Sequence, residues 1–210
     1  MRIKQEVAQV SGNNCTILGA TKGVAKEVVD FVLDNNLLDV VGENRAQEFR
    51  DKYHERHFGK MHFIGRLQTN KIKYLQNTGA LIHGLDSLEL AKEIEKRGGA
   101  NCLVQVNVGK ELAKGGVFLE NAIKFVKLVE KNCPQVQIKG VMAVLPVAES
   151  DTLKVLYTEL DAWFLGFKKV FPDKTILSAG MSEDWRFAIE YAGANIIRPG
   201  SVLFGGRTYT

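Results

Sequence analysis

The stretch TILSAGMSEDWRFAIEYAGANIIRPG, residues 175–200, shows the pattern that decides the fold. It begins with a short apolar run, TILSAG (175–180), and ends with a second one, NIIRPG (195–200), and a longer amphipathic segment separates them. Strands that alternate with helical segments are typical of a parallel sheet with helical crossovers. This stretch therefore predicts two parallel strands joined by one helix.

The same unit recurs through the rest of the chain. Between the apolar runs, apolar residues follow three- and four-residue spacing, which predicts amphipathic helices. No linker divides the sequence, so we expect one domain, residues 1–210, with eight strand–helix units. That number favours a single closed (β/α)8 TIM barrel over an open doubly wound sheet, which usually has about six strands. The other six predicted strands are CTILGA (15–20), DVVGE (39–43), MHFIG (61–65), ALIHGL (80–85), CLVQVNV (102–108) and IKGVMAVL (138–145).

Length and composition agree with one barrel. At 210 residues, of which 45% are hydrophobic, the chain is able to bury about 70% of its unfolded surface around one core. It lies near the lower limit of about 200 residues for this fold, so little length is left for a second domain. We therefore expect any functional site to lie on the barrel itself.

Charge and cysteine content point to a cytoplasmic protein. The net charge is +4 and basic residues are interleaved with acidic ones, so we expect neither nucleic acid nor a membrane as partner. Cys15, Cys102 and Cys133 lack paired spacing, which argues against disulfides and structural zinc and suits a reducing compartment. The N-terminus lacks the apolar run of a signal peptide, and no stretch approaches the roughly 20 apolar residues of a membrane span.

A histidine cluster offers only a weak case for a metal. His54, His57 and His62 are close in sequence, but only the first two would share a helical face. Basic residues stand beside them and would repel a cation. We predict no metal site.

One lysine stands where a barrel presents its reactive groups. The loops that follow the strands form one face, so residues directly after different strands converge there. Lys22 follows the first predicted strand. Partial burial would lower the pKa of its amine and make it a nucleophile for an aldehyde. The alternative is a solvated lysine in a turn.

Two loops on the same face are suited to a phosphate. GMS (180–182) offers backbone N–H groups and the Ser182 hydroxyl at a predicted helix start, and PGS (199–201) offers Gly200 and the Ser201 hydroxyl. Barrels often bind phosphate with the loops after their last two strands. The alternatives are that Ser182 caps its helix and that the second loop is only a turn. Asn44, followed by Gln47, likewise predicts a capping box.

Arg198 directly precedes the second loop. Its guanidinium would reach the pyridine nitrogen of a cofactor that is anchored by its phosphate and by Lys22. A permanently charged arginine opposes protonation of that nitrogen, so the ring would be a weak electron sink. The alternative is an arginine paired with a nearby carboxylate. Met142 would either pack inside the barrel or flank a bound ring.

With these residues in place, a family resemblance emerges. Seven segments in order resemble the pyridoxal 5′-phosphate (PLP) homeostasis proteins, which are similar to the N-terminal barrel of alanine racemases, PLP proteins of fold type III. The segments are ILGATK, VGENRAQE, MHFIGRLQTNKIKYL, LIHGLDS, LVQVNV, GVMAV and LSAGMSEDWRFAIEYAGANIIRPGSVLFGGRTY.

The resemblance implies roles for individual residues. Lys22 would hold PLP as a Schiff base, and Arg198 would face the pyridine nitrogen. Asn44 would line the pocket near the ring, and Lys114 resembles a second lysine near the cofactor entrance. The phosphate would be held by Ser182, Gly200 and Ser201.

The resemblance also implies a function. We expect a protein of PLP homeostasis that stores, buffers or delivers the cofactor, with apo forms of PLP-dependent enzymes as partners, and that is a monomer or a weak dimer. A racemase needs an acid/base group on each face of the cofactor, and the chain ends at Thr210 without the second domain that supplies one in alanine racemases. We therefore expect no residue with a catalytic role. The alternative is a small racemase-like PLP enzyme of low activity.

Overall fold

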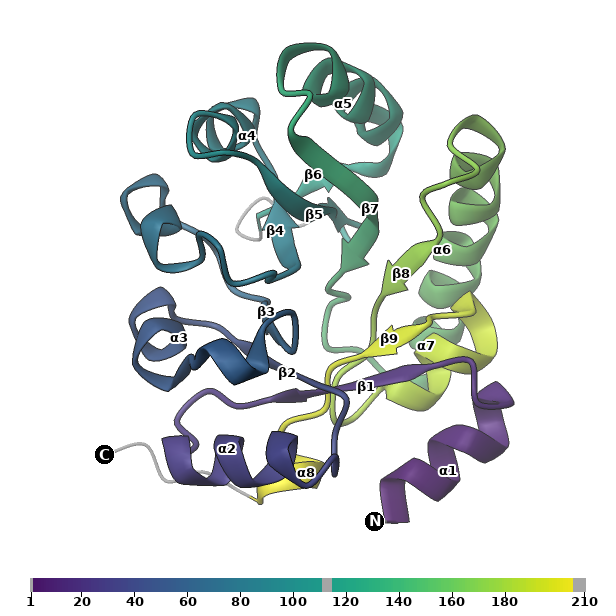
Figure 1. Cartoon of the computed structure of the whole chain (residues 1–210). Helices are drawn as coiled ribbons and strands as arrows, with labels where there is room; N and C mark the ends of the chain where they lie inside the picture. Colours follow the sequence, from purple (N-terminus) through teal and green to yellow (C-terminus); the bar gives the residue numbers. More distant parts are fainter. Residues whose placement is uncertain (1, 111–114, 206–210) are drawn as a thin grey trace.

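Eight parallel strands form a closed ring in the computed structural model, which describes residues 2–110 and 115–205. Neighbouring strands pair in chain order, and pairing of β1 with β9 and of β4 with β5 completes the ring (Figure 1). The predicted TIM barrel is confirmed. The strands of the ring are β1 (Thr16–Ala20), β2 (Val40–Glu43), β3 (Met61–Phe63), β4 (Ile82–Leu85), β5 (Ala100–Asn107), β7 (Val136–Ala143), β8 (Ile176–Ser178) and β9 (Ile196–Ile197).

Each of these strands lies within one of the eight predicted runs or overlaps it. One further strand in the described part of the chain, β6 (Val117–Phe118), was not predicted. It pairs in parallel with the carboxyl end of β5, with Val106 opposite Val117. It therefore extends the barrel mouth rather than the ring.

Helices cover the outside of the ring (Figure 1). Their buried residues recur at helical spacing; in α5, for example, Ala122, Val126 and Val129 are buried. Burial of one apolar face is what holds such helices against a sheet. The helices are α1 (Arg2–Ser11), α2 (Lys26–Asp34), α3 (Ala46–Lys52), α4 (Leu88–Glu95), α5 (Leu119–Asn132), α6 (Ser150–Val170), α7 (Trp185–Ala192) and α8 (Ser201–Phe204), with 3-10 helices η1 (Glu55–His57) and η2 (Thr69–Tyr74).

Neither of the two helix caps that the sequence suggested, at Asn44 and at Ser182, is present. Helix α3 begins at Ala46 after Arg45, and no side chain caps it. Helix α7 begins at Trp185, later than predicted, because residues 181–184 form a turn in which Asp184 Oδ1 accepts a hydrogen bond from Met181 N at 2.6 Å. Gly180 precedes this turn with φ +86°, and a Cβ there would lie 2.7 Å from the Ala188 side chain. The turn therefore requires glycine at this position.

Two apolar clusters form the core. The larger one lies between strands and helices, and the smaller one consists of Leu18, Leu81, Leu103, Met142 and Ile196. Side chains alternate along a strand, and the neighbours Ile17 and Ile197 belong to the larger cluster, so the smaller cluster fills the inside of the ring. No helix in the described parts of the chain has the length and apolar character needed to cross a bilayer.

Candidate functional site

Three of the predicted site residues line one cavity at the barrel mouth. The cavity has a volume of about 530 Å3, and Ser182, Arg198 and Gly200 line it together with Ala20 at the end of β1. Half-buried Lys22 follows Ala20 by two residues. The end of β1 and the loops after β8 and β9 therefore converge, whereas Lys22 itself is not among the residues that line the cavity.

Hydrogen bonds fix the two loops that were predicted to hold a phosphate. Gly200 N donates to Ser182 Oγ over 2.9 Å, which joins one loop to the other. Asp184 Oδ2 accepts a hydrogen bond of 2.6 Å from the hydroxyl of Tyr157, a fully buried residue of α6. Burial and the neighbouring Asp184 carboxylate raise the pKa of Tyr157, so the phenol keeps its proton for this bond. The loop after β8 is thus held from two sides.

Arg198 is a buried cation at the edge of the cavity. Its side chain donates to Ser178 Oγ over 2.8 Å and to the carbonyl oxygen of Ala143 over 3.0 Å, and the residue is 5% exposed. Burial lowers the pKa of Arg198 to about 10. Among the ion pairs of residues 2–110 and 115–205, none includes Arg198, so the alternative of an arginine paired with a carboxylate is not met there. The guanidinium keeps N–H groups for an acceptor in the cavity.

The backbone on both sides of Lys22 is held in place. Thr21 N donates to Gly42 O over 2.9 Å, and the Thr21 carbonyl accepts from Lys52 Nζ over 2.8 Å. On the other side, Gly23 N donates to Glu48 Oε2 over 2.9 Å. These contacts fix the short loop that carries Lys22.

Lys52 is the centre of a buried ionic network beneath this loop. Its Nζ contacts Glu43 Oε1 at 2.7 Å and Glu48 Oε2 at 3.0 Å, so with Thr21 O it has three acceptors. Burial raises the pKa of Glu43, and the hydrogen bonds from Lys52 and Thr21 oppose that shift. Lys52 was not predicted as a site residue, although its four-residue spacing from Glu48 on α3 indicates an ion pair.

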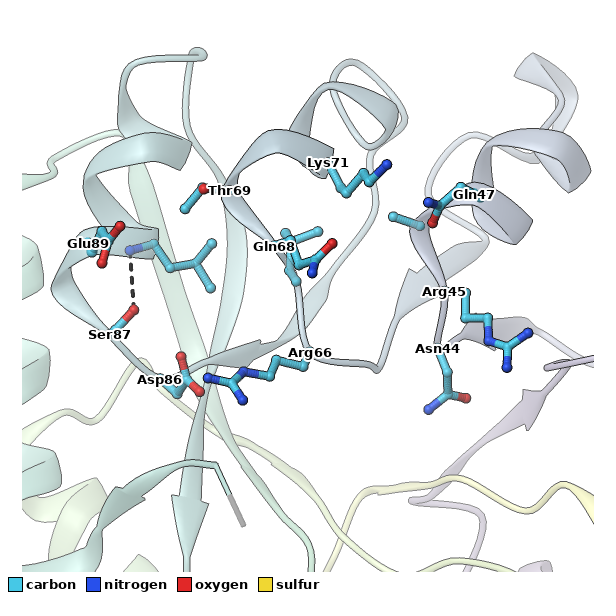
Figure 2. A pocket seen from close by; sticks show the side chains of 13 residues that line it. Asn44, Arg45, Gln47, Arg66, Gln68, Thr69, Lys71, Asp86, Ser87 and Glu89 are labelled. Atoms are coloured by element: carbon cyan, nitrogen blue, oxygen red, sulfur yellow. Dashed lines mark hydrogen bonds between the residues drawn. The ribbon is translucent and has the colours of Figure 1, made fainter. Parts of the chain in front are cut away.

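Asn44 lies in a different cavity of about 540 Å3, over the ends of β2, β3 and β4. Figure 2 shows Arg66 extending toward Asp86 in this cavity, while Asn44 lies on the far side of Arg66 from Asp86. Among the other predicted residues, Met142 packs inside the ring and Ser201 is exposed at the first position of α8. Lys114 lies outside the described residues.

Comparison with known proteins places the chain in a family. The alanine racemase N-terminal domain family matches residues 12–208. A pyridoxal phosphate homeostasis protein of Aquifex aeolicus is 42% identical over 94% of this chain and 90% of its own length. The chain belongs to the pyridoxal phosphate homeostasis proteins. The Escherichia coli K12 protein of that name is 32% identical over 80% of this chain and 76% of its own length.

Solved structures agree on the fold. PipY of Synechococcus elongatus PCC7942, determined with PLP bound, matches with a TM-score of 0.78 at 24% identity, over 97% of this chain and all of PipY. Alanine racemase of Clostridium difficile 630 in complex with cycloserine matches with a TM-score of 0.76 at 16% identity, over 98% of this chain and 59% of the racemase. The barrel is therefore of the alanine racemase N-terminal type.

Proposed function

We propose that this chain binds PLP as a Schiff base on Lys22 and serves PLP homeostasis by holding, buffering or delivering the cofactor. The observation that carries the proposal is Arg198, a buried cation that forms no ion pair among the described residues, at the edge of a cavity that Ser182 and Gly200 also line. A buried cation is stabilised by an acceptor or an anion brought to it. PLP offers both, a ring nitrogen and a phosphate.

The residues present fit the three groups of PLP. The Ser182 hydroxyl accepts from Gly200 N and still has its own hydrogen to donate to a phosphate oxygen. The amine of Lys22 would condense with the aldehyde and release water, which forms the imine. Arg198 would donate to the ring nitrogen and keep it unprotonated, so the ring would be a poor electron sink. This chemistry suits a carrier better than a racemase.

The experiment is a PLP titration of two matched serine variants. Ser182→Ala removes a hydroxyl that would contact the phosphate, and we expect PLP affinity to fall about tenfold, as for one hydrogen bond to a charged group. Ser150→Ala is the control, because exposed Ser150 lines the same cavity from the start of α6. Equal affinities of both variants and the unchanged chain would contradict the phosphate assignment.

Transfer of PLP to an apo enzyme distinguishes a carrier from an enzyme. A carrier loaded with PLP restores activity to an apo PLP-dependent enzyme and leaves L-alanine optically unchanged. A racemase-like enzyme racemises the amino acid well above the rate of free PLP, and that outcome would overturn the proposed role.

A further inference from the structure

Four polar side chains form a continuous hydrogen-bonded chain inside the barrel. His62 Nδ1 lies 3.1 Å from His83 Nε2, and His83 Nδ1 lies 3.1 Å from Ser178 Oγ. Arg198 then donates to Ser178 Oγ over 2.8 Å. His62 and His83 come from β3 and β4, whereas Ser178 and Arg198 come from β8 and the end of β9, so the chain joins two separate parts of the ring.

All four side chains are buried inside the ring. Their exposed fractions are 8% for His62, 0% for His83 and Ser178, and 5% for Arg198. The residues next to them in the strands point the other way, into the outer core: Met61, Phe63, Ile82, Leu177 and Ile197. The inside of small barrels is usually filled by branched apolar residues, as the Leu18 cluster fills it here. Burial of polar groups in such a place costs free energy of desolvation, which is offset only when each group has a hydrogen-bond partner.

Counting donors gives the chain a direction. Arg198 only donates, so Ser178 Oγ accepts, and the hydroxyl hydrogen of Ser178 goes to His83 Nδ1. His83 then carries its hydrogen on Nε2 and donates it to His62 Nδ1. In this order, from Arg198 through Ser178 and His83 to His62, the Ser178 hydrogen has an acceptor, whereas with both histidine bonds reversed it would find none among the four side chains.

The two histidines are neutral, as this order requires. Burial lowers the pKa of His62 to about 4. Burial lowers the pKa of His83 well below its usual value, and the Arg198 cation lowers it further. A neutral His83 keeps the lone pair on Nδ1 that receives the Ser178 hydrogen. The chain therefore contains a single charge, on Arg198.

We propose that Ser178 and His83 are positioning residues that hold the Arg198 guanidinium as a donor toward the ring nitrogen of PLP, an inference that rests on the proposed function. The Arg198 guanidinium is held at one nitrogen by Ser178 and at another by the carbonyl of Ala143. Two bonds to a planar fork fix its orientation. Without Ser178, one bond is left and the guanidinium is able to turn away from the ring.

The test compares Ser178→Ala with Leu103→Met. Leu103 is also buried inside the ring but takes no part in the chain. Each variant is loaded with PLP labelled with 15N at the ring nitrogen, and the resonance of that nitrogen is recorded by NMR. Borohydride reduction of the same samples measures how much PLP is bound covalently.

We expect Ser178→Ala to shift the nitrogen resonance and to weaken PLP binding about tenfold, while reducible PLP at saturation stays stoichiometric. Leu103→Met should change neither. An unshifted resonance in fully loaded Ser178→Ala would overturn the positioning role and leave the proposed function intact. Absence of reducible PLP in the unchanged chain would overturn both.

A second measurement tests the proposal if the Ser178→Ala chain does not fold. In protein labelled with 15N histidine, the unchanged chain should show His83 with its hydrogen on Nε2 at neutral pH, and Ser178→Thr, which keeps the hydroxyl, should preserve this tautomer and the ring-nitrogen resonance. The opposite tautomer of His83 in the unchanged chain would contradict the direction of the chain.

Discussion

The Lys52 network and the His83 chain are both buried and both support the proposed PLP site, but they differ in charge and in what they hold. Lys52 joins two carboxylates and fixes the backbone around Lys22. His83 is neutral and belongs to a chain that fixes the side chain of Arg198. An ionic network is costly to break because a charge is left unpaired, whereas a neutral chain is most sensitive to protonation.

The largest effect should follow from breaking the ionic network. Lys52→Met leaves Glu43, which is fully buried, without its cation, and we expect unfolding free energy to fall by about 3–5 kcal/mol. Denaturant unfolding measures the change. Lys96→Met, which removes an ion pair between exposed Lys96 and Glu93, is the control and should have little effect. Equal effects of the two substitutions would show that the network is not a buried ionic one.

The neutral chain should respond to acid. The pKa of His62 is about 4 in the folded protein, below its value of about 6.5 when unfolded, so the unfolded state binds more protons between these values. Above pH 6.5, His62 is neutral in both states and the free energy of unfolding is at its highest. As the pH falls toward 4, this free energy decreases by up to about 3 kcal/mol. We expect the free energy of unfolding of His62→Gln to depend less on pH over this range. Identical pH profiles for the variant and the unchanged chain would contradict a buried neutral His62.

A smaller effect should come from the turn that carries Ser182. Tyr157→Phe removes the hydroxyl that donates to Asp184, a hydrogen bond to a charged acceptor worth about 2 kcal/mol. Thermal unfolding of this variant and of Tyr53→Phe measures it, because half-buried Tyr53 is a control from another part of the barrel. A Tyr157→Phe chain as stable as the control would show that this bond does not hold the turn.

Much of the fold could be predicted from the repeated strand–helix unit, and part of the site from the residues that follow strand ends. The barrel follows from eight apolar runs, and the convergence of Ser182, Arg198 and Gly200 follows from their positions after the last strands. Ser182 does not cap α7, because Asp184 Oδ1 accepts a hydrogen bond from Met181 N, a contact that depends on turn geometry.

Side-chain contacts across the ring could not be predicted from the sequence. His83 and Ser178 are 95 residues apart, and each stands alone in an apolar run, so nothing local pairs them. A single polar residue inside a predicted buried strand was the available signal, since such a residue needs a partner.

The central claim is that Lys22 holds PLP. It is tested most directly by loading the chain with PLP, reducing it with borohydride and mapping the modified lysine by peptide mass spectrometry, with Lys22→Ala and the exposed Lys127→Ala in parallel. We predict one adduct on the peptide that contains Lys22, the same adduct in Lys127→Ala, and none in a folded Lys22→Ala chain. An adduct on another lysine, or none at saturating PLP, would contradict the assignment.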